Sequence, residues 1–322
     1  MTWLVAGCNG YIGRHVVSEL LKQDIAVVGI DRDDAPFFFL PQHSERFVYL
    51  PMDIAHDNPE SLCQKLKDLD ITSVIHLAAL KSVSESFEKA ELYALVNEIG
   101  TLNVLRLSHL LNVKRFIFAS SAAVYGQVDS SKPIEENLGT FPISPYGVSK
   151  LNAEKIVEEF CAKFEMTGFI LRFFNVAGGE KSSFMETSGP NIFPAIFNAV
   201  KQKSSFNVFG NKFMTVDGTC ERDYIHVVDV ANAICQVGLT RKFFQTSKSY
   251  VYNLGSGKGV SVLTVINLFK QHLGEKLQFR ITDARFGDAG CVISNTNQFK
   301  SEFSWEPKLT IERMVADYLA LL

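Results

Sequence analysis

Three glycines at intervals of three residues, in the segment GCNGYIG, constrain the fold more strongly than any other feature of the 322-residue chain. Gly7 follows the apolar run WLVA, and Gly13 lies at the start of the helix-like segment YIGRHVVSELLKQ. Glycines at these positions allow a tight turn after a strand, and they let backbone N–H groups approach a pyrophosphate at the positive end of a helix. A second apolar run ends at Asp31, the acidic position expected to bind the ribose hydroxyls of an adenine nucleotide. The pattern predicts a dinucleotide site.

Two acidic residues at strand ends bear on which dinucleotide binds. The carboxylate of Asp31 repels the extra phosphate of NADP, whereas Arg32 attracts it, so the sequence favours NAD. Asp53, in PMDI at the end of another expected strand, has two interpretations. It holds the adenine amino group through neighbouring atoms, or it caps a helix.

The order of apolar and amphipathic segments indicates the fold class. Runs such as VVGI and VIHL are apolar on both faces, which is typical of buried parallel strands with covering helices. After residue 176 the rhythm loosens into Gly, Pro, Ser and Asn. We therefore predict an α/β protein with a Rossmann-type, doubly wound parallel sheet. The NAD-binding domain spans 1–176, with a return near 222–255, and a smaller α/β domain for the substrate spans 177–322.

Composition excludes several classes of protein. A formal net charge of −3 without a Lys/Arg block gives no electrostatic footprint for nucleic acid or an anionic membrane. The six cysteines are scattered without a CxxC, and the seven histidines form no metal-binding pair, so neither a zinc site nor a disulfide framework is indicated. No basic segment precedes MTWLVAG, and no apolar stretch approaches roughly 18 residues. We expect a reduced, cytoplasmic protein that binds no metal, membrane or nucleic acid.

The segment SPYGVSK places a tyrosine and a lysine on one face of an expected helix. Ser144 is a suitable N-cap, and Pro145 suits the first helical turn, where a missing N–H costs nothing. Tyr146 and Lys150 are then four positions apart and share a face. By itself the pair is also compatible with an amphipathic helix that anchors a core.

A second segment, FASSAAVYG, adds a hydroxyl group to this pair. Ser120 and Ser121 follow an expected strand, at the carboxyl edge where open parallel sheets bind ligands, although ordinary loop serines would look the same. Joined to Tyr146 and Lys150, Ser121 completes an acid–base set. A phenol with a pKa near 10 is a poor base at neutral pH, so a nearby ammonium and a positive nicotinamide are needed to favour the phenolate.

These motifs, with HLAALKSVSES, RFFNVAG and DGTCERDYIHV, resemble the extended short-chain dehydrogenase/reductase family, most closely its UDP-galactose (UDP-glucose) 4-epimerases. The similarity runs from the first strand to FSWEPKLTIERM. It implies a homodimeric isomerase of galactose metabolism that holds NAD permanently and acts on a UDP-sugar. Tyr146 would remove the 4′-hydroxyl proton while C4′ gives its hydride to NAD, with Ser121 bridging hydroxyl and phenol. The 4-keto sugar would then turn and take the hydride back on its other face.

The same resemblance assigns binding roles to individual residues. Cofactor contacts are implied for Gly7, Gly10, Tyr11, Ile12, Gly13, Asp31, Asp53, Ile54, Lys81, Asn97, Tyr146 and Lys150. Substrate contacts are implied for Ser121, Tyr146, Asn175, Asn191, Arg222, Arg285, Asp288 and Val292. Each arginine has an alternative role in a surface ion pair, but the planar guanidinium suits phosphate oxygens. His226 is interpreted as a structural polar residue.

The segment RFGDAGCV bears on the choice of sugar. Aligned on the family's RxGD, it puts Val292 where epimerases restricted to plain hexoses often carry tyrosine, and Cys291 takes this place if the register slips by one. Both are smaller than tyrosine, so we expect 2-acetamido sugars to be accepted beside plain hexoses. Simple buried packing is the alternative role of Val292.

Some residues depart from the family pattern, and some related functions remain as alternatives. Ala6 replaces a small hydroxyl residue, and Ala123 replaces a frequent threonine. A 4,6-dehydratase would need an acid and a base where the chain has Ala122 and Ala123, which disfavours that activity. A reductase, an epimerase acting mainly on UDP-N-acetylhexosamines, and a cofactor-sensing regulator are the other candidates. The apolar run from Pro36 to Pro41 has no assigned role.

Overall fold

The chain divides into two compact units, each assembled from several segments. The computed structural model describes residues 1–33, 45–128, 132–189, 191–243, 247–285 and 287–322. Unit 1 comprises 1–124, 144–172 and 231–252, and unit 2 comprises 125–143, 173–230 and 253–322. The apolar run Pro36–Pro41 lies outside the described residues.

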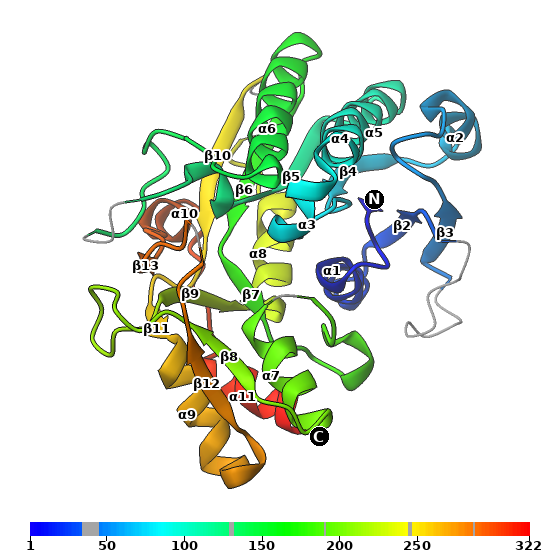
Figure 1. Ribbon diagram of the computed structural model, residues 1–322. Coiled ribbons are helices and arrows are strands. Elements are labelled where there is room, and N and C mark those ends of the chain that lie inside the picture. Colours follow the sequence, from blue (N-terminus) through cyan, green and yellow to red (C-terminus); the bar gives the residue numbers. More distant parts are fainter. Residues whose placement is uncertain (34–44, 129–131, 190, 244–246, 286) are drawn as a thin grey trace. The chain divides into compact units, whose positions relative to one another are not determined.

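A seven-stranded sheet forms the centre of unit 1 (Figure 1). Its strand order is β10-β6-β5-β4-β1-β2-β3, and the pairs β1–β2, β2–β3, β1–β4 and β4–β5 are parallel. The order reverses between β1 and β4, so the carboxyl ends of these two strands form the switch point at which such sheets bind ligands. The predicted doubly wound α/β fold is confirmed. The strands are β1 (Thr2–Ala6), β2 (Ala26–Asp31), β3 (Phe47–Pro51), β4 (Ile71–His76), β5 (Arg115–Ser121), β6 (Thr167–Phe173) and β10 (Ser249–Leu254).

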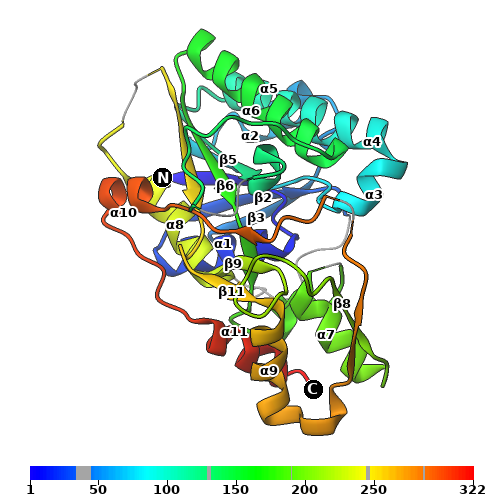
Figure 2. The same cartoon turned by 60° about the vertical axis from the view of Figure 1, so that its left-hand side comes forward.

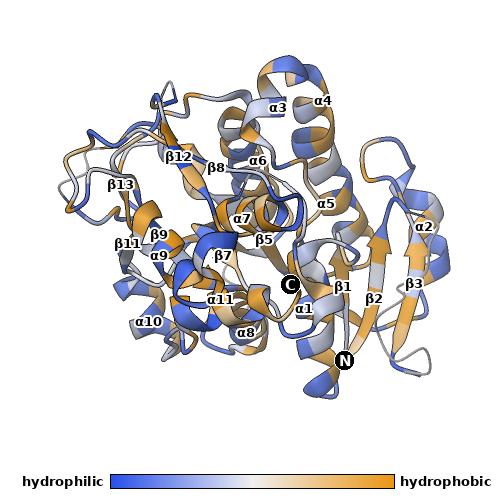
Figure 3. Cartoon of the chain, turned by 60° about the horizontal axis from the view of Figure 1, so that its bottom comes forward, coloured by the Kyte–Doolittle hydropathy of each residue, from blue (hydrophilic) through white to orange (hydrophobic). Residues whose placement is uncertain are grey.

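Alternating side chains of these strands are buried on the two faces of the sheet. Leu4 of β1 and Phe116 of β5 join a core with Val104 of α5 and Val157 of α6, and Figure 2 shows α5 and α6 side by side. Figure 3 shows how hydrophobic β1, β2 and β3 are. Each large apolar side chain buried in this way contributes roughly 1.5–3 kcal/mol. The helices are α1 (Tyr11–Lys22), α2 (Pro59–Leu66), α3 (Val83–Glu88), α4 (Ala90–Ala94), α5 (Gly100–Leu110), α6 (Pro145–Lys163) and α8 (Val227–Leu239), of which unit 1 contains the part from residue 231.

Two helical predictions can be compared with the structure. Helix α6 begins as the sequence indicates: Pro145 is its first residue, and the Ser144 hydroxyl accepts a hydrogen bond of 3.1 Å from the Gly147 N–H. The apolar pattern of the sequence also predicts one long helix near 92–111, but a π-helical turn, η1 (Leu95–Ile99), divides it into α4 and α5. Such turns are rare and are frequently found at functional sites.

Unit 2 contains two small sheets packed with helices. Strand β9 (Glu221–His226) is central to the first sheet; it pairs in parallel with β7 (Asn175–Ala177) and β13 (Cys291–Val292) and antiparallel with β11 (Gly259–Ser261). Phe193, Ile266 and Tyr318 belong to the core between these strands and the helices. The other elements of unit 2 are η3 (Ser182–Phe184), α7 (Ile192–Lys201), β8 (Phe206–Phe209), α9 (Val262–Leu273), η4 (Gly274–Lys276), β12 (Phe279–Thr282), α10 (Asn297–Phe303) and α11 (Ile311–Leu319). The short helix η2 (Ala122–Tyr125) belongs to unit 1 except for its last residue.

Three whole-chain features complete the fold. All six cysteines lie in described segments and are free thiols. In the described part of the chain, His, Cys, Asp and Glu side chains do not gather in groups of three or more that would hold a metal ion. Across the same residues, helices with the length and apolar character needed to span a bilayer are absent.

Candidate active site

The turn between β1 and α1 can be built only with glycine at two of its positions. Gly7 has φ +87°, and a Cβ there would lie 2.5 Å from the backbone nitrogen of Ala78. A Cβ on Gly13 would lie 2.0 Å from the carbonyl oxygen of Gly7. Gly10 is the N-cap of α1, and no side chain caps that N-terminus within the described chain. The helix therefore begins against a narrow backbone cradle of the kind that a pyrophosphate occupies.

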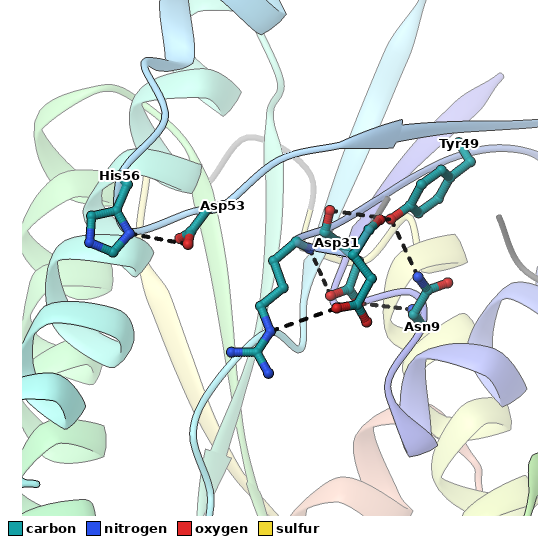
Figure 4. A network of polar contacts seen from close by, with 7 residues as sticks. Asn9, Asp31, Tyr49, Asp53 and His56 are labelled. Carbon is teal, nitrogen blue, oxygen red and sulfur yellow. Dashed lines mark hydrogen bonds and ion pairs between the residues drawn. The ribbon is translucent and has the colours of Figure 1, made fainter. Parts of the chain in front are cut away.

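Asp31 is held at the edge of this turn by backbone N–H groups. One carboxylate oxygen accepts a hydrogen bond of 2.9 Å from Asn9 N–H, and the other accepts one of 2.9 Å from Arg32 N–H. Burial raises the pKa of Asp31, and these two hydrogen bonds oppose the rise. The Tyr49 hydroxyl accepts a bond of 3.3 Å from the Asn9 amide and contacts the carbonyl oxygen of Asp33 (Figure 4). Asp31 is thus oriented from the first turn, as its predicted role requires.

Asp53 lies in a turn after β3 rather than at a helix N-cap. Its carboxylate accepts a hydrogen bond of 2.9 Å from Ala55 N–H and contacts His56 Nδ1 at 3.1 Å (Figure 4). Partial burial alone would raise the pKa of Asp53, but these hydrogen bonds lower it. The N-cap of α2 is Asn58 instead. Ile54 follows, with its side chain buried beside Gly100.

A pocket of about 270 Å³ opens at the switch point of the sheet in unit 1. Several residues that were predicted to bind the cofactor line it, and the lining includes Gly7, Gly10, Asp31, Asp53, Ile54 and Leu80. Lys81 lies beside it, with its ammonium 5.8 Å from the ring centroid of Tyr11, the first residue of α1. The glycine cradle, the ribose-binding carboxylate and a mostly preformed cleft fit the adenine and pyrophosphate part of a dinucleotide.

Asn97 connects this pocket to the helix that carries the tyrosine and the lysine. Its side-chain oxygen accepts a hydrogen bond of 2.8 Å from Leu80 N–H. Its amide NH2 group donates one hydrogen bond of 3.0 Å to the Leu80 carbonyl and one of 2.9 Å to the Ser149 hydroxyl. Ser149 in turn donates to the Tyr146 carbonyl at 2.8 Å. Asn97 sits within the π-helical turn and is buried, so it braces the wall of the pocket against α6.

The predicted acid–base residues come together in unit 1. Ser121 ends β5, and its hydroxyl forms a hydrogen bond with the phenol of Tyr146 on the first turn of α6. The Ser121 hydroxyl also accepts a hydrogen bond of 3.2 Å from Ala123 N–H. Burial raises the pKa of Tyr146, and the Ser121 hydrogen bond only opposes the rise. The groups of the chain alone therefore leave this phenol protonated, and the predicted lowering of its pKa by Lys150 and a nicotinamide together stays a prediction.

Lys150 is buried one turn further along α6. Its ammonium lies 4.2 Å from the ring centroid of Phe118 on β5. Burial lowers the pKa of Lys150 to about 7, and the negative charge of Glu154 opposes this. His76, at the end of β4, donates from Nε2 to Thr101 Oγ1 at 3.0 Å, since that hydroxyl donates to a carbonyl. Burial and the charge of Lys150 lower the pKa of His76 to about 3, so this imidazole is neutral.

In unit 2, the predicted diphosphate ligands lie around one end of β9. Arg222 donates a hydrogen bond of 2.8 Å to the Ala289 carbonyl, and its other terminal nitrogen is 3.7 Å from the Asp288 carboxylate. The Arg285 guanidinium stacks 3.6 Å from the ring centroid of Phe209. Burial raises the pKa of the Cys220 thiol, and the charges of Arg222, Asp288 and Arg285 all act on it. All three charged side chains are therefore near enough to Cys220 to influence its thiol.

The pairing of β13 with β9 distinguishes Val292 from Cys291. Val292 pairs with Arg222, and Cys291 pairs with Glu221, with its thiol 3.8 Å from the Glu221 carboxylate. Neighbouring residues in a strand point to opposite faces. Val292 thus shares the face of Arg222, and both β13 residues are half-buried.

The remaining predicted residues of unit 2 are anchored locally. Asn191 is the N-cap of α7, and its side-chain amide donates a hydrogen bond of 2.9 Å to the Glu186 carboxylate. Asn175 on β7 pairs with Tyr224 on β9. His226 is buried and lies 2.7 Å from Asp317, which also accepts from Gly179 N–H. These contacts agree with a structural role for His226, which stays a prediction.

Sequence reasoning missed a buried carboxylate beside Arg222. Asp223 accepts hydrogen bonds from Ser256 N–H at 2.7 Å, Ser256 Oγ at 2.6 Å, Gly257 N–H at 3.0 Å and Ser294 N–H at 3.1 Å. It is fully buried. Asp223 therefore ties two loops and the end of β13 to β9, next to Arg222. Sequence reasoning also missed the buried ion pair between Glu154 and Arg172 in unit 1.

Comparison with known proteins places these features in a family. The model of the NAD dependent epimerase/dehydratase family matches residues 3–255. UDP-glucose 4-epimerase 4 of Oryza sativa subsp. japonica is 36% identical over 98% of this chain and 88% of the relative.

Solved structures are similar over nearly the whole length. A UDP-glucose-4-epimerase from Stenotrophomonas maltophila, with bound NAD and formylated UDP-arabinopyranose, superposes with a TM-score of 0.88 at 30% identity, covering 99% of this chain and 97% of that one. A UDP-glucose 4-epimerase from Bifidobacterium longum, in complex with NAD+ and UDP, gives 0.87 at 31% identity with the same coverage.

Proposed function

The chain belongs to the NAD dependent epimerase/dehydratase family, and from this premise we propose that it is an isomerase that interconverts UDP-glucose and UDP-galactose at C4′. The observation that carries the proposal is the hydrogen bond between Ser121 and Tyr146, one helical turn from a buried lysine. This set lies in the same unit as the glycine turn and Asp31. Relatives with this fold are UDP-glucose 4-epimerases whose structures hold NAD.

The residues of unit 1 fit NAD as the cofactor. The cradle at Gly7 and Gly13 admits no Cβ, the start of α1 has no side-chain cap in the described chain, and Asp31 is held ready for ribose hydroxyls. Lys81, Asn97 and Lys150 would bind the nicotinamide half. Bound there, NAD would supply a reversible hydride acceptor for C4′ of the sugar, so that the overall reaction would have no net redox change.

The side chains of unit 1 would move the proton. Tyr146 accepts the proton of the sugar 4′-hydroxyl, with Ser121 relaying it between hydroxyl and phenol, and a 4-keto sugar results. Because burial raises the pKa of Tyr146, nearby positive charge is needed for the phenolate to form. Lys150 supplies such a charge while it is protonated. Tyr146 then returns the proton to the same oxygen after the sugar has turned over.

The side chains of unit 2 would hold the nucleotide sugar. Arg222 and Arg285 offer planar guanidinium groups to the diphosphate oxygens, because such groups match phosphate geometry. Asp288, which faces Arg222, would bind the uridine ribose. Asn175 and Asn191 would donate amide hydrogen bonds. In this proposal unit 1 is the cofactor domain and unit 2 is the substrate domain.

We also propose that the enzyme is a cytoplasmic homodimer. The six free thiols support a reducing compartment. Large apolar side chains are exposed on several helices of unit 1, and a second copy of the chain would cover them. They are Val83 and Phe87 on α3, Leu92 on α4, Ile99 in η1 and Val148 on α6.

An assay without added cofactor tests the proposed function. Purified protein is incubated with UDP-galactose or UDP-glucose, and the nucleotide that it carries is released by denaturation and identified. We expect conversion in both directions and recovery of NAD or NADH. Protein that carries NAD but converts neither sugar would contradict the proposal, and recovered NADP would mean that Arg32 rather than Asp31 governs the ribose pocket.

A further inference from the structure

A buried ion pair lies directly behind the acid–base residues. Glu154 on α6 accepts two hydrogen bonds from Arg172 on β6, one of 3.0 Å from Nε to Oε1 and one of 2.7 Å from Nη2 to Oε2. The two side chains are only 3% and 7% exposed. Oε1 also accepts a hydrogen bond from the Ser120 hydroxyl. Burying two charges is costly unless both are paired and hydrogen-bonded, and here they are.

This pair joins the two elements that carry the reacting groups. Ser120 directly precedes Ser121 at the end of β5, and Glu154 lies on the same helix as Tyr146. The hydrogen bond between Ser121 and Tyr146 spans the same strand and helix. The bond between Ser120 and Glu154 is therefore a second fixed link between them, and it limits how far the phenol and the serine hydroxyl can separate.

Glu154 is also one helical turn from Lys150. The ammonium lies over the Phe118 ring on β5, and its charge interacts with the neutral His76 on β4 and with Glu154 on its own helix. The charge of Glu154 favours the protonated lysine, whereas burial favours the neutral one. Arg172 satisfies the remaining acceptors of Glu154 from β6. An anion placed there keeps the lysine cationic in a site that would otherwise neutralise it.

We propose that Glu154 is a positioning residue of the epimerase: it holds the Ser121 end of β5 against α6 and supplies the negative charge that keeps Lys150 protonated. The proposal rests on the proposed function, because it concerns the same acid–base set. Arg172 makes the buried carboxylate tolerable, and the Ser120 hydroxyl transmits its position to Ser121.

Titration of Lys150 in the complete protein tests the charge. Lysine labelled with ¹³C at Cε is followed by NMR against pH, and its resonance is assigned by its loss in Lys150→Met. We expect Lys150 to titrate near pH 7 in the parent protein and at lower pH in Glu154→Gln. Glu159→Gln, an exposed change of equal charge on the same helix, should leave the titration unmoved. An unmoved Lys150 titration in Glu154→Gln would overturn the proposal.

Kinetics test the same charge and do not depend on how the resonance behaves. The alkaline limb of kcat against pH should move to lower pH in Glu154→Gln and stay in place in Glu159→Gln. If the parent protein converts no UDP-sugar, the proposed function fails, but the NMR titration still decides the role of Glu154.

Ser120→Ala is a milder variant that tests the mechanical link alone. It should keep the Lys150 titration and KM while kcat falls about 10-fold to 10²-fold, since small misplacements of reacting groups have costs of that order. Unchanged kcat in Ser120→Ala would show that the link does not position Ser121. This variant also keeps the proposal testable if Glu154→Gln does not fold, because Arg172 retains its partner.

Discussion

Each unit of the protein buries one carboxylate at the centre of its polar site, but the partners differ. In unit 1, Glu154 faces the cation Arg172 and lies one helical turn from the ionisable Lys150. In unit 2, Asp223 accepts hydrogen bonds from neutral hydroxyl and backbone N–H groups of Ser256, Gly257 and Ser294. Both carboxylates fix the ends of strands that carry predicted site residues.

This difference separates a region that influences the pKa of its neighbours from a bracing region that fixes their positions. Around Glu154 the neighbouring groups titrate, so a change of charge is felt by groups that move protons: burial lowers the pKa of Lys150 to about 7 and raises that of Tyr146. Around Asp223 the donors are neutral, so a change there alters geometry and stability. We therefore expect substitutions in the first region to change chemistry and pH dependence, and substitutions in the second to change stability and substrate fit.

Removal of the Tyr146 hydroxyl should have the largest effect. Tyr146→Phe deletes the group that accepts the proton and keeps the ring, so kcat should fall about 10²–10⁴-fold. The variant should fold and retain NAD, which denaturation and nucleotide analysis would show. Tyr93→Phe is a matched control, because its ring packs edge-on to Tyr146 at 6.3 Å while its hydroxyl contacts Ser82. Near-normal turnover in Tyr146→Phe would show that the region around Glu154 does not contain the proton-transfer group.

The charge of Lys150 should appear in the pH dependence of stability. Its pKa is about 7 in the folded chain and 10.5 when unperturbed, so the unfolded state binds more protons between these values. Stability therefore rises with pH in that window, by at most about 3 kcal/mol between pH 7 and pH 9. Urea unfolding of Lys150→Met should lack this rise. Parallel stability curves for the two proteins would mean that burial does not perturb this lysine.

Asp223→Asn tests the bracing region. An NH2 group replaces one carboxylate oxygen and then faces N–H and O–H groups that need an acceptor. The free energy of unfolding should therefore fall by about 1–3 kcal/mol. We expect KM to rise, because β13 and Arg222 lose a fixed neighbour, while the pH profile of kcat stays unchanged. Asp283→Asn, an exposed change of equal charge in unit 2, is the control. A shifted pH profile in Asp223→Asn would erase the contrast between the two carboxylates.

Local patterns in the sequence were sufficient for much of the fold. The apolar runs and the glycine turn predicted the parallel sheet, and Ser144 with Pro145 predicted the start of α6. The π-helical turn could not be predicted, because its residues also fit an ordinary helix and such turns are rare. Unit 2 is assembled from three separate segments of the chain, and that assembly leaves no local signal in the sequence either.

The candidate site was predictable where its residues are close in the chain. Glu154 continues the four-residue spacing of Tyr146 and Lys150, so the pattern held a signal that we did not use. Asp223 offered none, since Ser256 and Ser294 are 33 and 71 positions away. The raised pKa of Tyr146 depends on burial, which no spacing reveals.

The smallest expected effect concerns the choice of sugar, and it sharpens the geometric side of the comparison. Val292 shares the face of Arg222, whereas Cys291 faces Glu221. If Arg222 binds the diphosphate, a small residue at position 292 leaves room near the sugar for a 2-acetamido group. We therefore expect the protein to interconvert UDP-N-acetylglucosamine and UDP-N-acetylgalactosamine as well as the plain hexoses. Val292→Tyr should suppress the acetylated pair about 10-fold or more relative to the plain pair, because a filled pocket rejects added bulk to that extent.

Cys291→Tyr is the matched control, since it places the same ring on the opposite face of β13. It should leave the ratio of acetylated to plain turnover unchanged. An equal loss in both variants would mean that the ratio reports disturbance of the strand and not a gate at one face. Failure of the parent protein to use either acetylated sugar, with good turnover of UDP-galactose, would refute the gate at Val292 while the epimerase proposal stands. Because the test compares two substrates in one protein, it separates fit from the proton transfer at Tyr146, which both substrates share.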